Sequence, residues 1–276
     1  MSYKLNNGIT LHRNHFSSID STHLYAKRFL HANLQTNVKS NILSPKLCYL
    51  FSTDCQTKGI GQHDRPWFSP KGNIYATYII NPNITQSSIA KHNIKNIPQV
   101  AALSVCQALA KFEFVDCKIK WINDIFLDKK KLGGVLCESM ITDSLFLIIS
   151  IGINVNTMAF DASVTKNPTS LKLYMMGMDK FSQDYDIDMI LLTLSEVLVG
   201  HVLDFFKYGF EKFYSKVNQK LELFCGKYIN FVTPSNEKKE KNIVAKVLGI
   251  NSSGALILKV KNSQEIKCFE HGRILL

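Results

Sequence analysis

A loop with two closely spaced glycines is the first part of this sequence whose residue types suit chemistry on phosphates. Gly59 and Gly61 stand two positions apart in the segment Gln56–Trp67, between two segments predicted to be strands. Glycine lets a loop bring its backbone N–H groups close to a phosphate, and Lys58 and Arg65 could add charge-assisted hydrogen bonds to phosphate oxygens. Two nearby glycines are also typical of an ordinary turn, so this segment alone leaves both interpretations open.

A second segment places a carboxylate close in sequence to several lysines. Asp124 ends the run Lys-Trp-Ile-Asn-Asp at residues 120–124, and Lys131 opens the apolar run that follows a polar turn. An aspartate at the end of a strand could orient a lysine or hold Mg²⁺ beside a triphosphate. A solvated hairpin with a run of lysines gives the same pattern. The segment Gly152–Asn156, at the end of an apolar strand, is by itself typical of a turn.

The pattern of apolar residues predicts the elements that must position these segments. Strands are predicted at Lys46–Ser52, Asn73–Ile80, Lys118–Trp121, Ile125–Leu127 with Val135–Leu136, and Leu145–Val155. The last three of these segments should form one antiparallel sheet. Helices are predicted at His23–His31, from Pro98 to Phe112, at Asp186–Tyr208 and at Phe210–Lys220. Residues 1–18 are expected to form a strand or an unstructured lead-in.

The C-terminal part changes to short strands separated by turn signals. These strands are predicted at Ile229–Val232, Val244–Leu248, Ala255–Val260 and Glu265–Phe269. Their number and spacing predict a small SH3-like β-barrel. The fold class is therefore α/β (α+β), with two domains. Residues 1–222 should form a catalytic domain with a mixed, largely antiparallel sheet and packed helices, and residues 223–276 the small β domain.

The bulk composition is that of a core-forming protein without a membrane span. The 276 residues are 46% hydrophobic and 20% charged. The longest apolar run, Leu145–Val155, is too short to cross a bilayer, and the N-terminus has no apolar signal region. The seven cysteines form no CxxC pair, which argues against a disulfide framework or a zinc site. We therefore predict a cytoplasmic protein that does not act at a membrane.

Taken in order, the segments described above resemble the biotin–protein ligase family. They are Ser-Thr at 21–22, Gln-Thr-x-Gly-x-Gly at 56–61 followed by Arg65 and Trp67, Lys-Trp-x-Asn-Asp at 120–124, Lys-Leu-x-Gly-Val-Leu at 131–136, and Gly-Ile-Asn-Val-Asn at 152–156. The likeness covers residues 19–156 by motif and continues to the end by architecture. Because only a short lead-in precedes Ser21, we expect the form of this family that lacks the N-terminal DNA-binding domain.

The resemblance implies an enzyme that uses ATP and Mg²⁺ to convert biotin to biotinyl-5′-AMP. The biotinyl group would then pass to a lysine of an acceptor, the biotin carrier protein or domain of a carboxylase. Catalytic roles are implied for Lys131, Asp124 and Arg65, with Asp124 also a candidate Mg²⁺ ligand. Biotin-binding roles are implied for Ser21, Thr22, Gln56, Gly59, Gly61, Lys131 and Gly134. Nucleotide-binding roles are implied for Arg65, Trp67, Lys120, Asn123 and Asn154.

Four positions depart from the pattern of this family. Ile60 stands between the two glycines where a basic residue is common, and the loss of one cation–phosphate contact should cost about 1.5–3 kcal/mol of adenylate binding. His23 stands where asparagine is usual, Ser150 where glycine is frequent, and Ile122 where proline is common. These departures concern detail and not the family.

Three other functions are weighed against this one. Lipoate and octanoate ligases share the fold, but their usual Arg-Arg-x-Gly-Gly-Gly signature is absent from this sequence. A biotin-binding relative with weakened catalysis is favoured only by Ile60. The formal charge of +11 could attract nucleic acid, but without a DNA-binding domain such binding should be non-specific and salt-dependent. An exposed sheet edge could serve a homodimer or acceptor docking, and the sequence leaves these two open.

Overall fold

The computed structural model describes residues 1–35, 44–84, 93–112, 116–161, 167–179, 183–221, 224–233 and 241–275. Its larger part is an eight-stranded sheet with the strand order β1-β2-β3-β4-β8-β7-β6-β5. The strands are β1 (Ser2–Lys4), β2 (Thr10–Phe16), β3 (Leu47–Thr53), β4 (Ile74–Ile80), β5 (Lys118–Lys120), β6 (Asp124–Leu127), β7 (Lys130–Ile141) and β8 (Leu145–Ile153). β2 and β3 are parallel, and every other neighbouring pair is antiparallel. The predicted mixed, largely antiparallel sheet is confirmed.

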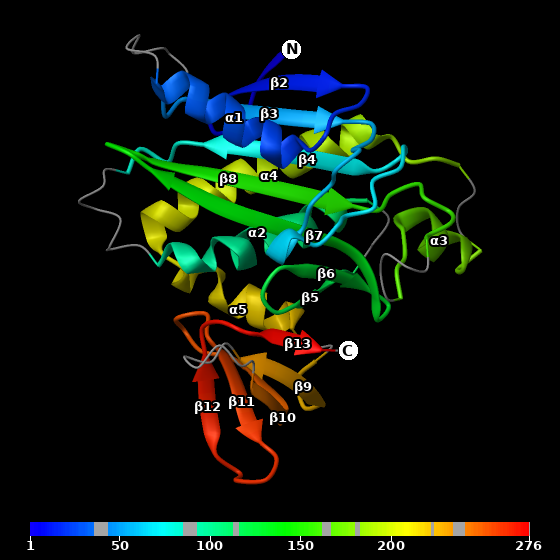
Figure 1. The fold of residues 1–276 in the computed structure, drawn as a ribbon, viewed down its shortest axis with the longest axis vertical. Coiled ribbons are helices and arrows are strands. Elements are labelled where there is room, and N and C mark those ends of the chain that lie inside the picture. The colour runs from blue at the N-terminus through cyan, green and yellow to red at the C-terminus, as the bar shows by residue number, and fades with distance from the viewer. Residues whose placement is uncertain are drawn as a thin grey trace.

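Helices cover both faces of this sheet (Figure 1). They are α1 (Thr22–Gln35), α2 (Ile97–Leu109), α3 (Leu171–Met176), α4 (Ile187–Tyr208) and α5 (Glu211–Lys220), with short 3₁₀ turns η2 (Gln62–Asp64) and η4 (Ile94–Asn96). On one face, Ala26 and Leu30 of α1 pack in a small cluster with Phe51. The main core lies on the other face, under α2 and α4. The central strand β4 is therefore buried along its whole length, as a sheet covered on both faces requires.

Helix α4 is long because its sequence carries both a cap and a continuous apolar stripe. The Asp186 side chain accepts hydrogen bonds from the backbone N–H groups of Asp188 and Met189, which caps the first turn. Among the described helices, α4 is the one with the length and apolar composition of a membrane span, and 44% of its most apolar window is buried inside the protein. The core helix of a globular domain has the same two properties, and α4 packs on α2 in this way.

The C-terminal residues form a second, five-stranded antiparallel sheet, in the order β12-β11-β10-β9-β13. Its strands are β9 (Tyr228–Thr233), β10 (Lys241–Ile250), β11 (Leu256–Val260), β12 (Ile266–Phe269) and β13 (Arg273–Leu275). In the β10–β11 turn, the carbonyl oxygen of Gly254 accepts hydrogen bonds from Gln99 Nε2 (3.0 Å) and Trp121 Nε1 (3.2 Å). The turn thus docks this sheet on α2. Closure into an SH3-like barrel stays a prediction, and so does the boundary at residues 222–223, which lies outside the described residues.

Most of the predicted elements agree with the structure, and the differences lie in short elements. The helix predicted at His23–His31 extends to Gln35. Residues 1–18 contain two paired strands, β1 and β2, instead of one lead-in segment. α3 and β13, of six and three residues, have no counterpart among the predicted elements. Elements this short have little intrinsic stability and form because of their tertiary contacts.

His201 should make the stability of the fold depend on pH. Its Nδ1 lies 2.9 Å from Ser104 Oγ. Burial, reinforced by Lys216 and Lys212 and opposed by Asp204, lowers the pKa of His201 to about 4. The unfolded chain therefore binds more protons than the folded chain below pH 6.5, and stability falls as the pH falls. We expect a loss of about 2 kcal/mol between pH 7 and pH 5.

Urea denaturation of the natural protein and of the His201→Asn variant at both pH values measures this loss. The asparagine amide can still meet the Ser104 hydroxyl but does not titrate. The pH-dependent loss should therefore be smaller in the variant by about 2 kcal/mol. Equal losses in the two proteins would show that other groups cause the pH dependence.

Candidate active site

An ion pair between Lys131 and Asp124 lies at the centre of the predicted site. Asp124 is the first residue of β6 and Lys131 the second of β7, and the register of these paired strands shifts after Ile125. Lys131 Nζ is 2.7 Å from Asp124 Oδ1, and the two side chains are 24% and 21% exposed. Lys120 Nζ lies 3.8 Å from the other oxygen, Oδ2. The carboxylate therefore orients Lys131 while the ammonium group stays accessible.

The surroundings of Asp124 are strongly cationic. Burial lowers the pKa of Lys120, and the nearby positive charges of Lys131, Arg65 and Arg273 add to this, while Asp124 acts in the opposite direction. Arg65 is exposed, in the loop that follows Gly61. One carboxylate thus faces an excess of positive charge, an arrangement that attracts polyanions such as a triphosphate.

Two glycines of neighbouring strands form a flat patch beside this ion pair, and the Trp67 indole lies on it. Gly134 and Gly152 are register partners in β7 and β8. A Cβ atom at Gly152 would lie 2.8 Å from Cε2 and Nε1 of Trp67, and one at Gly134 would lie 3.8 Å from its Cζ3. Lys131 Nζ is 5.3 Å from the centroid of the Trp67 ring. The Trp67 indole therefore covers the patch and lies next to the lysine ammonium group.

The loop that carries Trp67 is held by a close backbone approach at Gly59. The Trp67 N–H donates to the carbonyl oxygen of Gly59 at 2.8 Å. A Cβ atom at Gly59 would lie 2.5 Å from both the Ser69 hydroxyl and the Trp67 carbonyl oxygen, so only glycine fits there. Gly61 is less crowded, with its nearest neighbour 3.7 Å away. Backbone contact of these glycines with a ligand stays a prediction.

Ser21, Thr22 and Gln56 come together at the start of α1. Ser21 Oγ accepts a hydrogen bond from the Leu24 N–H at 3.4 Å, which caps the helix. Gln56 Oε1 accepts from Thr22 N (2.9 Å) and Thr22 Oγ1 (3.2 Å). Gln56 Nε2 donates to the Ser69 hydroxyl at 2.9 Å. The polar group that the sequence predicts is therefore assembled, and it adjoins the loop that carries Trp67.

The side-chain amides of Asn123 and Asn154 are used within the protein. Asn123 Nδ2 donates to the Val135 carbonyl oxygen at 2.5 Å, and Asn154 Nδ2 donates to that of Thr169 at 3.0 Å. Thr169 in turn donates its N–H to the carbonyl oxygen of Lys131 at 2.9 Å. Both asparagines thus support the backbone around Lys131, and their predicted contact with a nucleotide stays a prediction.

Three residues that the sequence analysis does not select are connected by hydrogen bonds to the polar group of Ser21, Thr22 and Gln56. Thr77 is fully buried in β4 and donates to Thr22 Oγ1 at 2.9 Å, Ser69 binds Gln56, and Glu138 joins through His23. A threonine inside an otherwise apolar strand is a signal of a polar contact, because a buried hydroxyl needs a partner. Ser69 and Glu138 carry no such signal.

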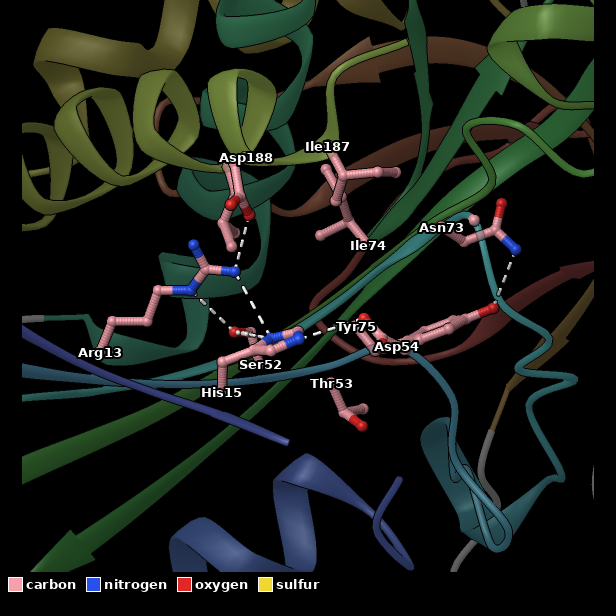
Figure 2. Close-up of a pocket in the computed structure, with 12 residues that line it drawn as sticks. Arg13, His15, Ser52, Thr53, Asp54, Asn73, Ile74, Tyr75, Ile187 and Asp188 are labelled. Atoms are coloured by element: carbon pink, nitrogen blue, oxygen red, sulfur yellow. Dashed lines mark hydrogen bonds and ion pairs between the residues drawn. The ribbon is translucent and has the colours of Figure 1, made fainter. Parts of the chain in front are cut away.

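A separate cavity of about 190 Å³ lies on the α4 side, between β2, β3 and the start of α4 (Figure 2). Arg13 Nε donates to Ser52 Oγ at 3.0 Å, and Arg13 Nη2 donates to Asp188 at 2.7 Å. His15 lies between Ser52 Oγ (3.0 Å) and Asp54 (3.1 Å). Ser52 is only 4% exposed. These side chains tie β2 and β3 to α4, and none of the predicted site residues lines this cavity.

Comparisons with known proteins find relatives among the biotin and lipoate ligases. The model of the biotin/lipoate A/B protein ligase family matches residues 24–156. The bifunctional ligase/repressor BirA of Bacillus subtilis is 27% identical over 218 residues, which are 76% of this chain and 61% of BirA. The biotin–[acetyl-CoA-carboxylase] ligase of Paracoccus denitrificans is 32% identical over 103 residues, 37% of this chain and 41% of that protein. The chain thus spans less than two thirds of the length of these curated relatives.

Solved structures extend the likeness to nearly the whole chain. The biotin protein ligase from Aquifex aeolicus in complex with biotin and ATP is 25% identical, with a TM-score of 0.74, and the match covers 96% of this chain and 97% of that one. The matched segment 24–156 contains the Lys131–Asp124 pair and the glycine patch. By sequence and fold, residues 24–156 match the biotin/lipoate A/B protein ligase family, and the chain is similar to biotin protein ligases over nearly its whole length.

Proposed function

We propose that the protein is an ATP-dependent biotin–protein ligase, which forms biotinyl-5′-AMP from biotin and ATP and transfers the biotinyl group to an acceptor lysine. The observation that carries this proposal is the Lys131–Asp124 ion pair at the edge of the Gly134–Gly152 patch. The Trp67 indole covers this patch, and a ligand carboxylate beside the indole would reach the accessible ammonium group of Lys131. Relatives named as biotin ligases support the choice of biotin.

The residues of the site suit both steps of this reaction. In the first, a biotin carboxylate oxygen attacks the α-phosphorus of ATP, and pyrophosphate leaves. Negative charge increases between the two reactants, and Lys131 Nζ would donate hydrogen bonds to both of them. Arg65 and Lys120 would hold the phosphates. In the second step, the amine of the acceptor lysine attacks the acyl carbon of biotinyl-5′-AMP, and AMP is released.

Mg²⁺ enters this proposal as part of the ATP substrate. One oxygen of Asp124 binds Lys131 and the other faces Lys120. Within the described ranges, no three His, Cys, Asp or Glu side chains gather into a metal site. A metal bound to Asp124 alone would have to compete with these lysines. We therefore assign Asp124 the role of orienting Lys131, and not that of holding a resident metal.

The acceptor that we propose is the biotin carrier domain of a carboxylase, in the cytoplasm. The formal charge of +11 favours encounter with an acidic protein domain. All seven cysteines are free thiols, as is usual for proteins of a reducing compartment.

Pyrophosphate–ATP exchange tests the proposed reaction directly. We expect exchange that requires biotin and is not supported by octanoate or lipoate at the same concentration. Exchange with octanoate or lipoate alone would assign the protein to the lipoate branch of the family. Biotin binding by calorimetry without exchange would identify a binding-only relative, with Ile60 as the first position to restore to arginine.

A further inference from the structure

A chain of hydrogen bonds connects Thr22 to a histidine that no part of the proposed mechanism uses. Thr77 Oγ1 lies 2.9 Å from Thr22 Oγ1 and 2.8 Å from Ser150 Oγ. Ser150 Oγ lies 2.8 Å from His23 Nδ1, and His23 Nε2 lies 2.9 Å from Glu138 Oε1. His23 and Thr77 are 2% and 0% exposed. Each group in the chain therefore depends on its neighbours, and not on water, for its hydrogen bonds.

The direction of these hydrogen bonds follows from the charge of Glu138. Although partial burial acts in the opposite direction, hydrogen bonds from Lys27 and His23 lower the pKa of Glu138, so it is a carboxylate that can only accept. His23 Nε2 must then carry the ring proton, and Nδ1 of the neutral ring is an acceptor. Ser150 therefore donates to Nδ1, and its oxygen stays available to accept from Thr77.

Protonation of His23 reverses the direction of these hydrogen bonds. Both ring nitrogens then donate, so Ser150 must donate to Thr77 and Thr77 can donate only toward Thr22. Since the Thr22 hydroxyl donates to Gln56 Oε1, Thr22 Oγ1 then has one acceptor position filled from within the protein. In the structure the Thr77 hydroxyl donates to Thr22 Oγ1. With neutral His23, Ser150 Oγ can also accept, so the Thr77 hydroxyl can turn to Ser150, and Thr22 Oγ1 is then more available to an N–H donor of a ligand.

We propose that His23 is a positioning residue for the ligand ring, because its neutral form keeps Thr22 Oγ1 available as an acceptor for a ureido N–H of biotin. This inference rests on the proposed function and adds to it a dependence of biotin binding on pH. His23 and Ser150, two of the residues that depart from the family pattern, are in direct contact with each other.

The charged groups around His23 are consistent with a neutral ring at neutral pH. Burial lowers its pKa, with a smaller contribution from Lys27 in the same helix, while Glu138 on β7 acts in the opposite direction. The strands β4 and β8 present only the hydroxyl groups of Thr77 and Ser150 to this chain. The ring should therefore become protonated only below about pH 6.5, the ordinary value for histidine.

Calorimetric measurement of the Kd for biotin between pH 5 and pH 8 tests this proposal. In His23→Asn, the amide replaces the ring at the Nδ1 position and can still accept from Ser150. In His23→Gln, the amide reaches the Nε2 position and keeps only the contact with Glu138. A third variant, Ser150→Ala, interrupts the chain with His23 intact. Urea denaturation and the KM for ATP report whether the fold and the nucleotide site are preserved.

We expect the Kd of the natural protein to rise as the pH falls below about 6.5, approaching a tenfold change. The His23→Asn variant should bind as tightly at pH 7.5 and show a smaller pH dependence, while His23→Gln should bind roughly tenfold more weakly at every pH. Ser150→Ala should lose the pH dependence, and the KM for ATP should change little in all three. Titration of the biotin carboxylate is common to all four proteins and cancels in the comparison.

Two results would overturn the role of His23 alone. One is a natural protein that binds biotin with a Kd independent of pH, and the other is an unchanged pH dependence in His23→Asn. A natural protein that binds no biotin at any pH would instead overturn the proposed function, and this inference with it.

Discussion

Replacement of Lys131 by alanine is expected to lower the rate of biotin adenylation by a factor on the order of 10³. Lys131 Nζ is the ammonium group held at the edge of the glycine patch, 2.7 Å from Asp124. Its hydrogen bonds would strengthen as charge increases between the carboxylate and the α-phosphate, so its loss should affect kcat more than the KM for biotin. Pyrophosphate exchange at saturating biotin measures this effect.

Lys130→Ala is the matched control for this substitution. Lys130 is the preceding residue of β7 and is exposed, so its replacement removes an equal charge without removing a group from the site. We expect its activity to stay within about twofold of the natural protein, as is usual for exposed positions. Comparable losses in the two variants would mean that Lys131 acts through the overall charge of the surface.

The Asp124→Asn variant separates orientation from charge. If Asp124 acts by orienting Lys131, a double variant with both Asp124→Asn and Lys131→Ala should have an exchange activity scarcely lower than that of Lys131→Ala alone, because the two residues act as one unit. Additive losses would indicate an independent role for Asp124, such as a contact with Mg²⁺ of the ATP substrate.

Replacement of Gly254 by alanine is expected to lower the free energy of unfolding by about 3 kcal/mol. Gly254 has a φ of +85°, and an added Cβ atom would clash with the Asn96 side chain and lie 2.7 Å from Gln99 Nε2. Both side chains are nearly fully buried, at 3% and 1% exposure, so they have little room to move. The clash would also disturb the hydrogen bond from Trp121 to the Gly254 carbonyl oxygen.

Gly8→Ala provides the control, because Gly8 has the same φ of +85° and no atom within 4 Å of an added Cβ. Its substitution should cost only the conformational strain of alanine, roughly 1–2 kcal/mol. Urea denaturation of the two variants and the natural protein measures the difference. Equal costs would show that the turn is not constrained by its contact with α2. A selective loss of exchange activity in Gly254→Ala would show that the second sheet supports residues 120–124.

Local patterns in the sequence predict the strands and much of the site, because both depend on neighbouring residues. The hairpin that joins β6 and β7 places Asp124 beside Lys131, and this closeness follows from a short turn. The helix cap at Ser21 and the cap of α4 at Asp186 are likewise local.

Contacts between distant parts of the chain could not be predicted. His23 and Glu138 are 115 positions apart, and Thr22 and Thr77 are 55 apart. Their meeting depends on how α1 docks on β4 and β8, which no local pattern specifies. No local pattern predicts the contact of the Trp67 ring with Gly152 either, or the hydrogen bond from the Asn154 amide to the Thr169 carbonyl oxygen.

The parallel pairing of β2 with β3 has a consequence for protein synthesis. Two parallel neighbours need a connection that returns to the same end of the sheet, and α1 lies in this connection between β2 and β3. Thr22 and His23 are therefore translated early, but Ser150, the hydrogen-bond partner of His23 on β8, follows much later. The ligand-binding surface can form only after residue 153 has left the ribosome. Until then α1 can pack only on β3 and β4, and the part of its apolar side that meets β8 stays uncovered; exposed apolar surface of this kind makes a partly formed chain prone to aggregation.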